Sequence, residues 1–190
     1  MTDDVHPLGA GIRLRPVTRA DAASLAAALT RSRTYMKPWE PVRPDFFYTE
    51  EGQRARLAGL LADRDAGRSM PWVLSDAEDR VVGGFTLNAI VLGACHSAVL
   101  GYWVDVELAG RGLATAAVRT VCEVARNDLR LHRVEACTVL HNVASQRVLA
   151  KCGFEEFGVA PRYMHIDGEW RDHRLFQRIL HDGPMTGAED

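Results

Sequence analysis

The spacing of hydrophobic residues along the chain predicts four helices. In the clearest case, apolar residues recur every three or four positions from Leu113 to Val124, which indicates a helix that runs to about Asn127. Side-chain caps mark the helix starts, because Ser, Thr and Asp oxygens accept hydrogen bonds from free backbone N–H groups. The expected helices run from a capping-box pattern at 18–21 to about Leu29, over 50–66 after Thr49, from 113 to 127, and over 145–152 before Gly153.

Short apolar or alternating segments predict about seven strands. A half-buried strand alternates apolar and polar side chains, whereas a strand covered on both faces is continuously apolar. Asp167-Gly168 separates two such segments and is a type I′ turn signal, so the last two segments are expected to form a hairpin. The expected strands are 12–15, 72–74, 81–92, 99–104, 133–140, 163–166 and 170–179.

The order strand, helix, strand over 99–140 predicts two neighbouring parallel strands. Such strands end at the same edge of a sheet, and this carboxyl edge is where open α/β sheets bind ligands. We therefore expect an α/β (α+β) fold, with a twisted mixed sheet of about seven strands flanked by about four helices. Three prolines between residues 37 and 44 interrupt the helices and predict a structured loop that carries Trp39.

Length and composition are those of one globular domain. The chain has 190 residues, 47% hydrophobic and 25% charged, and we expect a single domain over 1–182 with a polar tail over 183–190. A formal net charge of −2 gives no reason to expect a nucleic-acid partner. No apolar run approaches the roughly 20 residues of a membrane span, and the acidic N-terminus lacks a signal-peptide pattern. Four isolated cysteines are interpreted as reduced, buried thiols, which indicates a cytoplasmic protein.

A glycine-containing loop, Ala-Gly-Arg-Gly-Leu-Ala-Thr over 109–115, begins the helix at 113. Gly110 and Gly112 let the backbone approach an anion closely, Ala114 keeps the helix start narrow, and Thr115 adds a hydroxyl. Alone, the loop is equally compatible with a turn that needs a positive φ at one glycine. It is not a dinucleotide fingerprint, which needs a third glycine, and it is not a P-loop, which needs Gly-Lys-Ser/Thr.

A second motif begins at Asn142, directly after the strand at 133–140. Asn142 and Ser145 stand at the start of a short helix, and Lys151-Cys152-Gly153-Phe154 closes it. Helix capping by Asn142 is locally a sufficient explanation. Its expected position beside the glycine loop favours one binding site shared by both motifs.

Together these motifs resemble the GNAT superfamily of N-acetyltransferases, most closely its branch of ribosomal-protein N-terminal acetyltransferases. The resemblance spans nearly the whole chain, from the strand at 12–15 to the strand at 170–179. It is carried by Leu14-Arg15-Pro16, Lys37-Pro38-Trp39, Gly101-Tyr102-Trp103-Val104, Gly110-Arg111-Gly112-Leu113-Ala114-Thr115 and Asn142-x-x-Ser145-x-x-Val148-Leu149-x-Lys151-x-Gly153-Phe154. It implies acetyl-CoA as the acyl donor, and the sequence leaves a longer acyl group, such as succinyl, open as an alternative.

The resemblance also implies a donor site. The loop of Ala109, Gly110, Arg111, Gly112, Leu113, Ala114 and Thr115, with Asn142 and Ser145, would hold coenzyme A, the loop itself binding the pyrophosphate. The strand with Tyr102, Trp103 and Val104 would separate from its neighbour and pair with the pantetheine arm. The family loop usually starts with Gln or Arg, so Ala109 is a departure that affects affinity more than the backbone cradle.

Direct transfer of an acyl group from a thioester to an amine is the implied chemistry. Ser145 corresponds to the serine that assists the leaving thiolate in the ribosomal-protein branch, although a helix-start serine without chemistry is an equal alternative. A backbone N–H at Trp103 or Val104 can stabilise the oxyanion.

The base is left open by the sequence. Met164 occupies the place where that branch often has a glutamate, and a methionine cannot accept a proton. Glu40, His165 and His96 are the candidates, and we expect that no single base is indispensable. We expect no metal site, because the acids and histidines near the C-terminal hairpin stand at adjacent strand positions and point to opposite faces.

The acceptor amine has three interpretations. A protein N-terminus is preferred because the Trp39 loop resembles the ribosomal-protein branch. The alternatives are a small amine, such as an antibiotic, polyamine or amino acid, and a catalytically weak acyl-CoA sensor. A homodimer is expected from the resemblance and from Trp170 and Phe176 in the C-terminal hairpin, and no membrane partner is expected.

Overall fold

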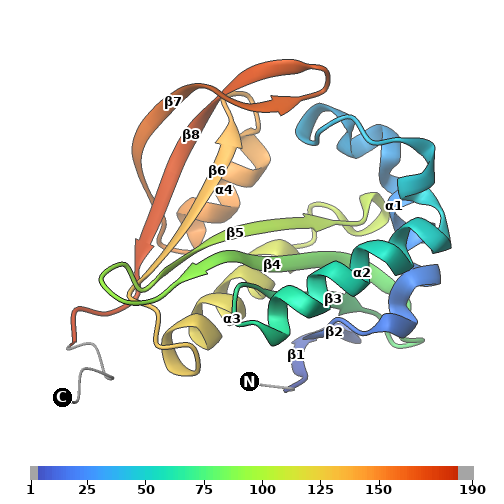
Figure 1. Ribbon diagram of the computed structural model, residues 1–190, viewed down its shortest axis with the longest axis horizontal. Helices are drawn as coiled ribbons and strands as arrows, with labels where there is room; N and C mark the ends of the chain where they lie inside the picture. The colour runs from blue at the N-terminus through green and yellow to red at the C-terminus, as the bar shows by residue number, and fades with distance from the viewer. Residues whose placement is uncertain (1–3, 184–190) are drawn as a thin grey trace.

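The computed structural model describes residues 4–183 and contains one eight-stranded sheet with helices on both faces (Figure 1). The strands are β1 (His6–Gly9), β2 (Ile12–Pro16), β3 (Met70–Ser75), β4 (Val81–Val91), β5 (Ser97–Val104), β6 (Arg133–Val139), β7 (Glu155–Ile166) and β8 (Glu169–Ile179). The helices are α1 (Ala22–Met36), α2 (Glu50–Asp65), α3 (Leu113–Asn127) and α4 (Val143–Lys151), with 3-10 turns η1 (Arg19–Asp21), η2 (Lys37–Trp39), η3 (Asp45–Tyr48) and η4 (Val106–Leu108). Of the polar tail expected over 183–190, the described residues include only Gly183.

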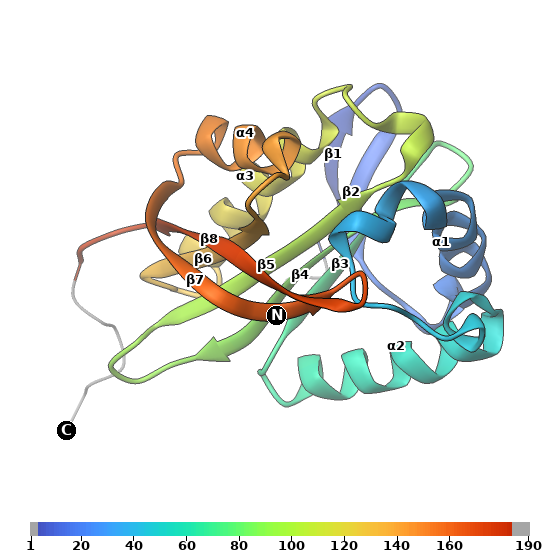
Figure 2. The same cartoon turned by 90° about the horizontal axis from the view of Figure 1, so that it is seen from above.

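The sheet order is β1-β2-β3-β4-β5-β6-β8-β7, and β5 and β6 are parallel, as predicted. Helices α1 and α2 lie on one face, and α3 and α4 lie on the other (Figure 2). The two faces of the sheet belong to different clusters: Phe85 and Leu87 of β4 pack with α3, whereas Val73 of β3 packs with α1 and α2. Val81 also faces α1 and α2, because the register shifts near the start of β4. The expected mixed α/β sheet with four helices is confirmed.

Helices α2, α3 and α4 match their predicted ranges closely, and Thr49 caps α2 by accepting a hydrogen bond from Gly52 N at 3.1 Å. Helix α1 ends at Met36 rather than near Leu29. Polar residues after Leu29 concealed this extension, although Ser32 and Met36 are buried. The prediction was short because it followed the alanine and leucine run alone.

Two strand predictions were incomplete. Strand β1 was not predicted, and β7 begins at Glu155, well before the expected segment at 163–166. Strand β7 is the edge of the sheet, is largely exposed, and shifts register twice against β8, so it shows no simple alternation. One thiol prediction was also wrong: Cys122 and Cys152 are buried, but Cys95 is exposed in the β4–β5 turn.

Strands β5 and β6 separate soon after they begin. Their pairing covers Ser97–Val99 of β5 and Arg133–Glu135 of β6. Further along, β5 pairs with β4 and β6 pairs with β8, so the facing edges are free from Leu100 to Val104. A free strand edge presents backbone N–H and C=O groups to any extended ligand placed between the strands.

Candidate active site

The glycine loop lies at the carboxyl end of β5 and leads directly into α3. Gly110 has φ +77° and Gly112 has φ +80°, so both glycines use the left-handed region. A Cβ at either position would meet nothing within 4 Å. Arg111 is exposed, and Leu113 anchors the helix start in the core. The first N–H groups of α3 have no intrahelical acceptor and face an open loop, which is a geometry suited to a phosphate.

A buried carboxylate holds this loop in place. Asp105, fully buried between β5 and η4, accepts hydrogen bonds from Glu107 N at 3.0 Å and from Arg31 Nε at 3.1 Å. The hydrogen bond to Asp105 raises the pKa of the Arg31 guanidinium. Ser32 Oγ accepts a further bond from Val106 N at 3.2 Å. Helix α1 therefore fixes the end of β5, a role that the sequence pattern did not reveal.

The second motif reaches β5 through a pair of hydroxyl groups. Asn142 caps α4 by accepting a hydrogen bond from Ser145 N at 3.1 Å, as local sequence predicted. Ser145 Oγ lies 2.8 Å from the Tyr102 hydroxyl, and the same hydroxyl donates to Ser145 O at 3.4 Å. The structure thus brings together Tyr102, Asn142 and Ser145 from both motifs.

Tyr102 is held as a neutral phenol. Its ring stacks on Phe85 with a centroid distance of 5.5 Å. Burial raises the pKa of Tyr102 to about 12, and the hydrogen bond with Ser145 opposes only part of that shift. The phenol therefore keeps its proton near neutral pH and can donate a hydrogen bond to Ser145 Oγ, at 2.8 Å, in place of Ser145 O at 3.4 Å. Ser145 is then free to direct its own proton elsewhere.

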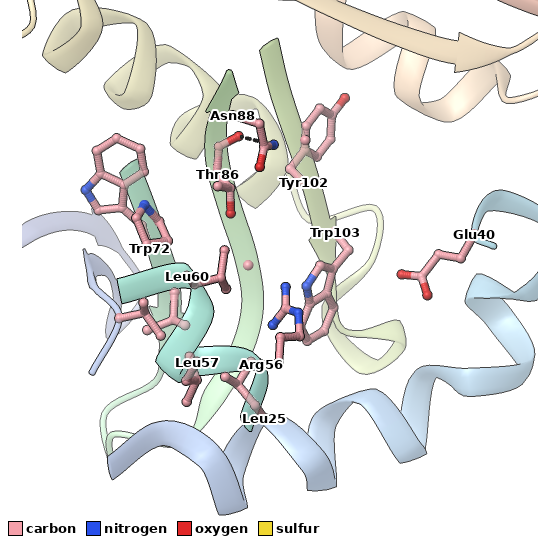
Figure 3. Close-up of a pocket in the computed structure, with 15 residues that line it drawn as sticks. Leu25, Glu40, Arg56, Leu57, Leu60, Trp72, Thr86, Asn88, Tyr102 and Trp103 are labelled. Carbon is pink, nitrogen blue, oxygen red and sulfur yellow. Dashed lines mark hydrogen bonds between the residues drawn. The ribbon is translucent and has the colours of Figure 1, made fainter. Parts of the chain in front are cut away.

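A cavity of about 220 Å³ opens on the α1/α2 side of β4 and β5 (Figure 3). Its floor lacks side chains at Gly84 and Gly101, and a Cβ at Gly84 would lie 2.6 Å from Trp103 Nε1. The polar groups on its walls are Glu40, Arg56, Thr86 and Asn88. The cavity is lined by Val17, Leu25, Glu40, Arg56, Leu57, Leu60, Pro71, Trp72, Val73, Gly84, Thr86, Asn88, Gly101, Tyr102 and Trp103.

Glu40 is the one carboxylate in the lining of this cavity. Figure 3 shows its side chain directed toward Trp103. Burial raises the pKa of Glu40, and the positive charges of Arg43 and Arg56 offset part of this shift. The backbone of Glu40 is fixed, because its carbonyl oxygen accepts a hydrogen bond from Asp167 N at 3.0 Å. A buried carboxylate with a raised pKa is a stronger base than an exposed one.

The other candidate bases lie elsewhere. His165 is exposed on β7, where its ring packs on Trp170 at a centroid distance of 5.5 Å, and it is absent from the cavity lining. His96 precedes β5, at the end of the strand opposite to the glycine loop. Met164 is partly exposed beside His165. Of the expected bases, the structure places Glu40 alone in the cavity.

Comparison with known proteins identifies the family. A family model described as an acetyltransferase (GNAT) domain matches residues 12–155. The chain belongs to the GNAT acetyltransferases. It is 33% identical over 168 residues to the probable N-acetyltransferase YjcK of Bacillus subtilis, covering 88% of this chain and 93% of that protein.

Two further proteins extend this comparison. The chain is 33% identical over 163 residues to the [ribosomal protein uS5]-alanine N-acetyltransferase of Escherichia coli, covering 85% of this chain and 84% of that protein. The solved structure of Mycobacterium smegmatis RimJ in complex with CoA-disulfide superposes with a TM-score of 0.86 at 34% identity, covering 92% of this chain and 85% of that one.

As a GNAT enzyme, the chain is an N-acetyltransferase that uses acetyl-CoA as its acyl donor. The residues present fit that donor. Two glycines leave an open backbone loop at the start of α3, and the unpaired edge of β5 can hydrogen-bond to the pantetheine arm. Among residues 4–183, no group of three His, Cys, Asp or Glu side chains is arranged to hold a metal ion. Within the same range, no helix is long and apolar enough to cross a membrane.

Some features of the site were not visible in the sequence. The contact between Tyr102 and Ser145 joins positions far apart in the chain, and Arg56 lies on α2 without any motif around it. Gly84 and Gly101 stand in strands, where a glycine that weakens a strand is a signal of close approach by another group. That signal was available at Gly101, next to Tyr102, but nothing in the sequence showed which face of the sheet it opened.

Proposed function

We propose that this enzyme acetylates the α-amine of a protein N-terminus, with a ribosomal protein that begins with alanine as the acceptor. The observation that carries the proposal is the arrangement around β5. The Tyr102–Ser145 pair lies on the α3/α4 side, the gap between β5 and β6 lies beside the strand, and the cavity with Glu40 lies on the α1/α2 side. The E. coli uS5-alanine acetyltransferase, at 33% identity, supports the choice of acceptor.

Acetyl-CoA supplies the acyl group, and the residues of the chain arrange the two partners. The loop at 109–115 and Asn142 hold the donor, and the free edge at Trp103 and Val104 orients its arm. A backbone N–H at one of these two positions stabilises the negative charge that develops on the carbonyl oxygen. In the cavity, Glu40 takes the proton of the incoming ammonium, either directly or through one water. Ser145, supported by Tyr102, donates a hydrogen bond to the departing sulfur.

The acceptor class is tested by thiol release from acetyl-CoA. The purified enzyme is given an alanine-starting peptide, a polyamine, an aminoglycoside and free amino acids at matched concentrations. We expect thiol release with the peptide to exceed release with each small amine at least about tenfold in kcat/KM, since the peptide backbone can hydrogen-bond to the polar groups on the cavity walls. Release with a small amine alone would overturn the proposal, and no release with any amine would favour a sensor.

Ser145→Ala is expected to lower kcat by about tenfold to 100-fold, with little change in the KM of either substrate. A donor to the leaving sulfur acts mainly as charge develops there, so its loss is confined to the transition state. Tyr102→Phe removes only the supporting phenol and is expected to lower kcat less than Ser145→Ala does. Steady-state kinetics with the alanine-starting peptide measure both effects. A rise in KM without a fall in kcat would show that Ser145 is a helix-start serine without a role in the chemistry.

We also propose that one domain over 1–182 forms a homodimer in the cytoplasm. The support lies in the β7–β8 hairpin, where Phe157, Val159 and Trp170 are 44%, 50% and 62% exposed. Phe176, expected to contribute to this surface, is instead buried in the core at 6% exposure, because it faces inward from β8. Light scattering is expected to give twice the 21.0 kDa chain mass. A single species of the chain mass at micromolar concentration would contradict the dimer.

A further inference from the structure

Arg56, in the lining of the acceptor cavity, and Arg43, beside it on the Phe47 ring, form no ion pair with a carboxylate among residues 4–183. Arg56, on α2, donates from Nη1 to Gln53 Oε1 at 3.3 Å, and its guanidinium carbon lies 5.9 Å from the centre of the Phe47 ring. The Arg43 guanidinium carbon lies 4.8 Å from the centre of the same ring. Neighbouring arginines are paired: Arg54 with Glu50, and Arg33 with Asp45 at 2.8 Å. Arg43 and Arg56 therefore bring two positive charges to one place without a paired carboxylate.

The groups around Arg56 carry more positive than negative charge. Burial against the cavity walls lowers the pKa of Arg56, the charge of Arg43 lowers it further, and the charge of Glu40 opposes the shift. The outer part of Arg56 is exposed to solvent, where a ligand can reach it. Glu40 is the one acid in the lining, so one negative charge faces two positive charges. Glu40 must also be free to receive a proton during the reaction. An anion brought by another molecule would complete the charge balance.

That anion is not part of the acyl donor. Arg56 lies on the face of the sheet covered by α1 and α2, whereas the glycine loop leads into α3 on the opposite side (Figure 2). The coenzyme A phosphates are thus assigned to the other side of β5. A carboxylate carried by the acceptor is the group that can reach Arg56 when the amine lies near Glu40.

We infer that Arg56, assisted by Arg43, makes the enzyme prefer acceptor peptides with an acidic side chain within the first few residues after the N-terminal amine. The inference rests on the proposed function, since it places a peptide in the cavity. A guanidinium binds a carboxylate through paired N–H groups, and in a partly desolvated site such a contact discriminates between partners of opposite charge. Neutral residues at the same position would leave Arg56 without a partner, and a lysine would be repelled.

The test uses alanine-starting peptides that are identical except for glutamate, glutamine or lysine at the second, third or fourth position. For the wild-type enzyme at low salt, kcat/KM at the sensitive position is expected to be about tenfold higher with glutamate than with glutamine, and lower still with lysine. Arg56→Gln is expected to remove the preference by raising the KM of the glutamate peptide. Because the Arg56 charge also lowers the pKa of Glu40, the peptides are compared at a pH where Glu40 is ionised in both enzymes. Arg56→Lys is expected to restore part of it, and Arg56→Glu to shift the preference to lysine. Arg54→Gln, on the same helix, is the matched control and is expected to change nothing.

The outcomes separate this inference from the proposed function. Equal kcat/KM for glutamate and glutamine peptides in the wild type would overturn the inference and leave peptide acetylation intact. An equal loss for all three peptides in Arg56→Gln, with or without weaker coenzyme A binding, would assign Arg56 a structural role and also overturn it. Acetylation of small amines but no peptide would overturn both.

Discussion

Gly112→Asp is expected to abolish binding of coenzyme A without unfolding the enzyme. The new carboxylate would stand where the backbone N–H groups of the α3 start meet a phosphate, and it would both repel and obstruct that group. The fold should tolerate the change, because a Cβ at Gly112 meets nothing within 4 Å and aspartate accepts a positive φ better than most residues. In the wild type, coenzyme A at 100 times its Kd stabilises the folded state by about 2.7 kcal/mol. This corresponds to a rise in Tm of roughly 5–10 °C.

The measurement is the thermal shift caused by coenzyme A in each variant. Gly93→Asp is the matched control, because Gly93 also has a positive φ of +67°, also has an open Cβ position, and lies in the β4–β5 turn. Both variants place an aspartate at a similar positive φ and should be strained to a similar extent. Only Gly112→Asp should lose the rise in Tm caused by coenzyme A. A normal shift in Gly112→Asp would show that the loop does not hold the pyrophosphate.

Glu40→Gln is expected to lower kcat about 100-fold while leaving the coenzyme A thermal shift unchanged. Removal of a positioned general base typically costs 100-fold or more, and Glu40 is the one carboxylate that lines the cavity. Because burial raises its pKa, ionised Glu40 is disfavoured in the folded enzyme, and the neutral amide is not expected to lower Tm. His165→Ala, on the exposed hairpin, is expected to lower kcat far less than Glu40→Gln does. A loss below about tenfold in Glu40→Gln would instead support the expectation, drawn from the sequence, that no single base is indispensable.

The pH profile follows from the same carboxylate. Glu40 acts as a base only when ionised, so kcat/KM should fall as the pH drops through its raised pKa, and this limb should be lost in Glu40→Gln. At higher pH the rate should continue to rise until the acceptor amine is neutral. A profile of the same shape in both enzymes would exclude Glu40 as the titrating group.

The sequence predicted the donor side of the site better than the acceptor side. The glycine loop directly precedes α3, and Asn142 directly precedes α4. Periodicity and capping rules therefore locate both motifs from the sequence. Ser145 was a candidate on motif alone, but its partner Tyr102 is 43 positions away and its contact depends on how α4 packs. The sequence contains no comparable signal for Arg56, because a helix surface arginine is common and only the tertiary structure shows that it lacks a carboxylate.

Two long-range contacts explain why the cavity itself could not be predicted. The position of Glu40 depends on Asp167 N, which belongs to the turn between β7 and β8. Trp39 likewise lies against His141, with ring centroids 5.1 Å apart, so the proline-rich loop and the end of β6 lie against each other. The loop conformation is set by these partners rather than by its own prolines. Local propensity therefore predicted the loop correctly but did not indicate the direction of the Glu40 side chain.

The central claim, acetylation of a protein N-terminus, is tested most directly by locating the acetyl group on a product. A peptide that begins with alanine and contains an internal lysine is incubated with the enzyme and acetyl-CoA, and the product is fragmented in a mass spectrometer. The account predicts a single acetyl group on the α-amine, with the lysine unmodified and the modification lost in Gly112→Asp. An acetyl group on the lysine side chain, or an unmodified peptide beside an acetylated polyamine or free amino acid, would contradict it.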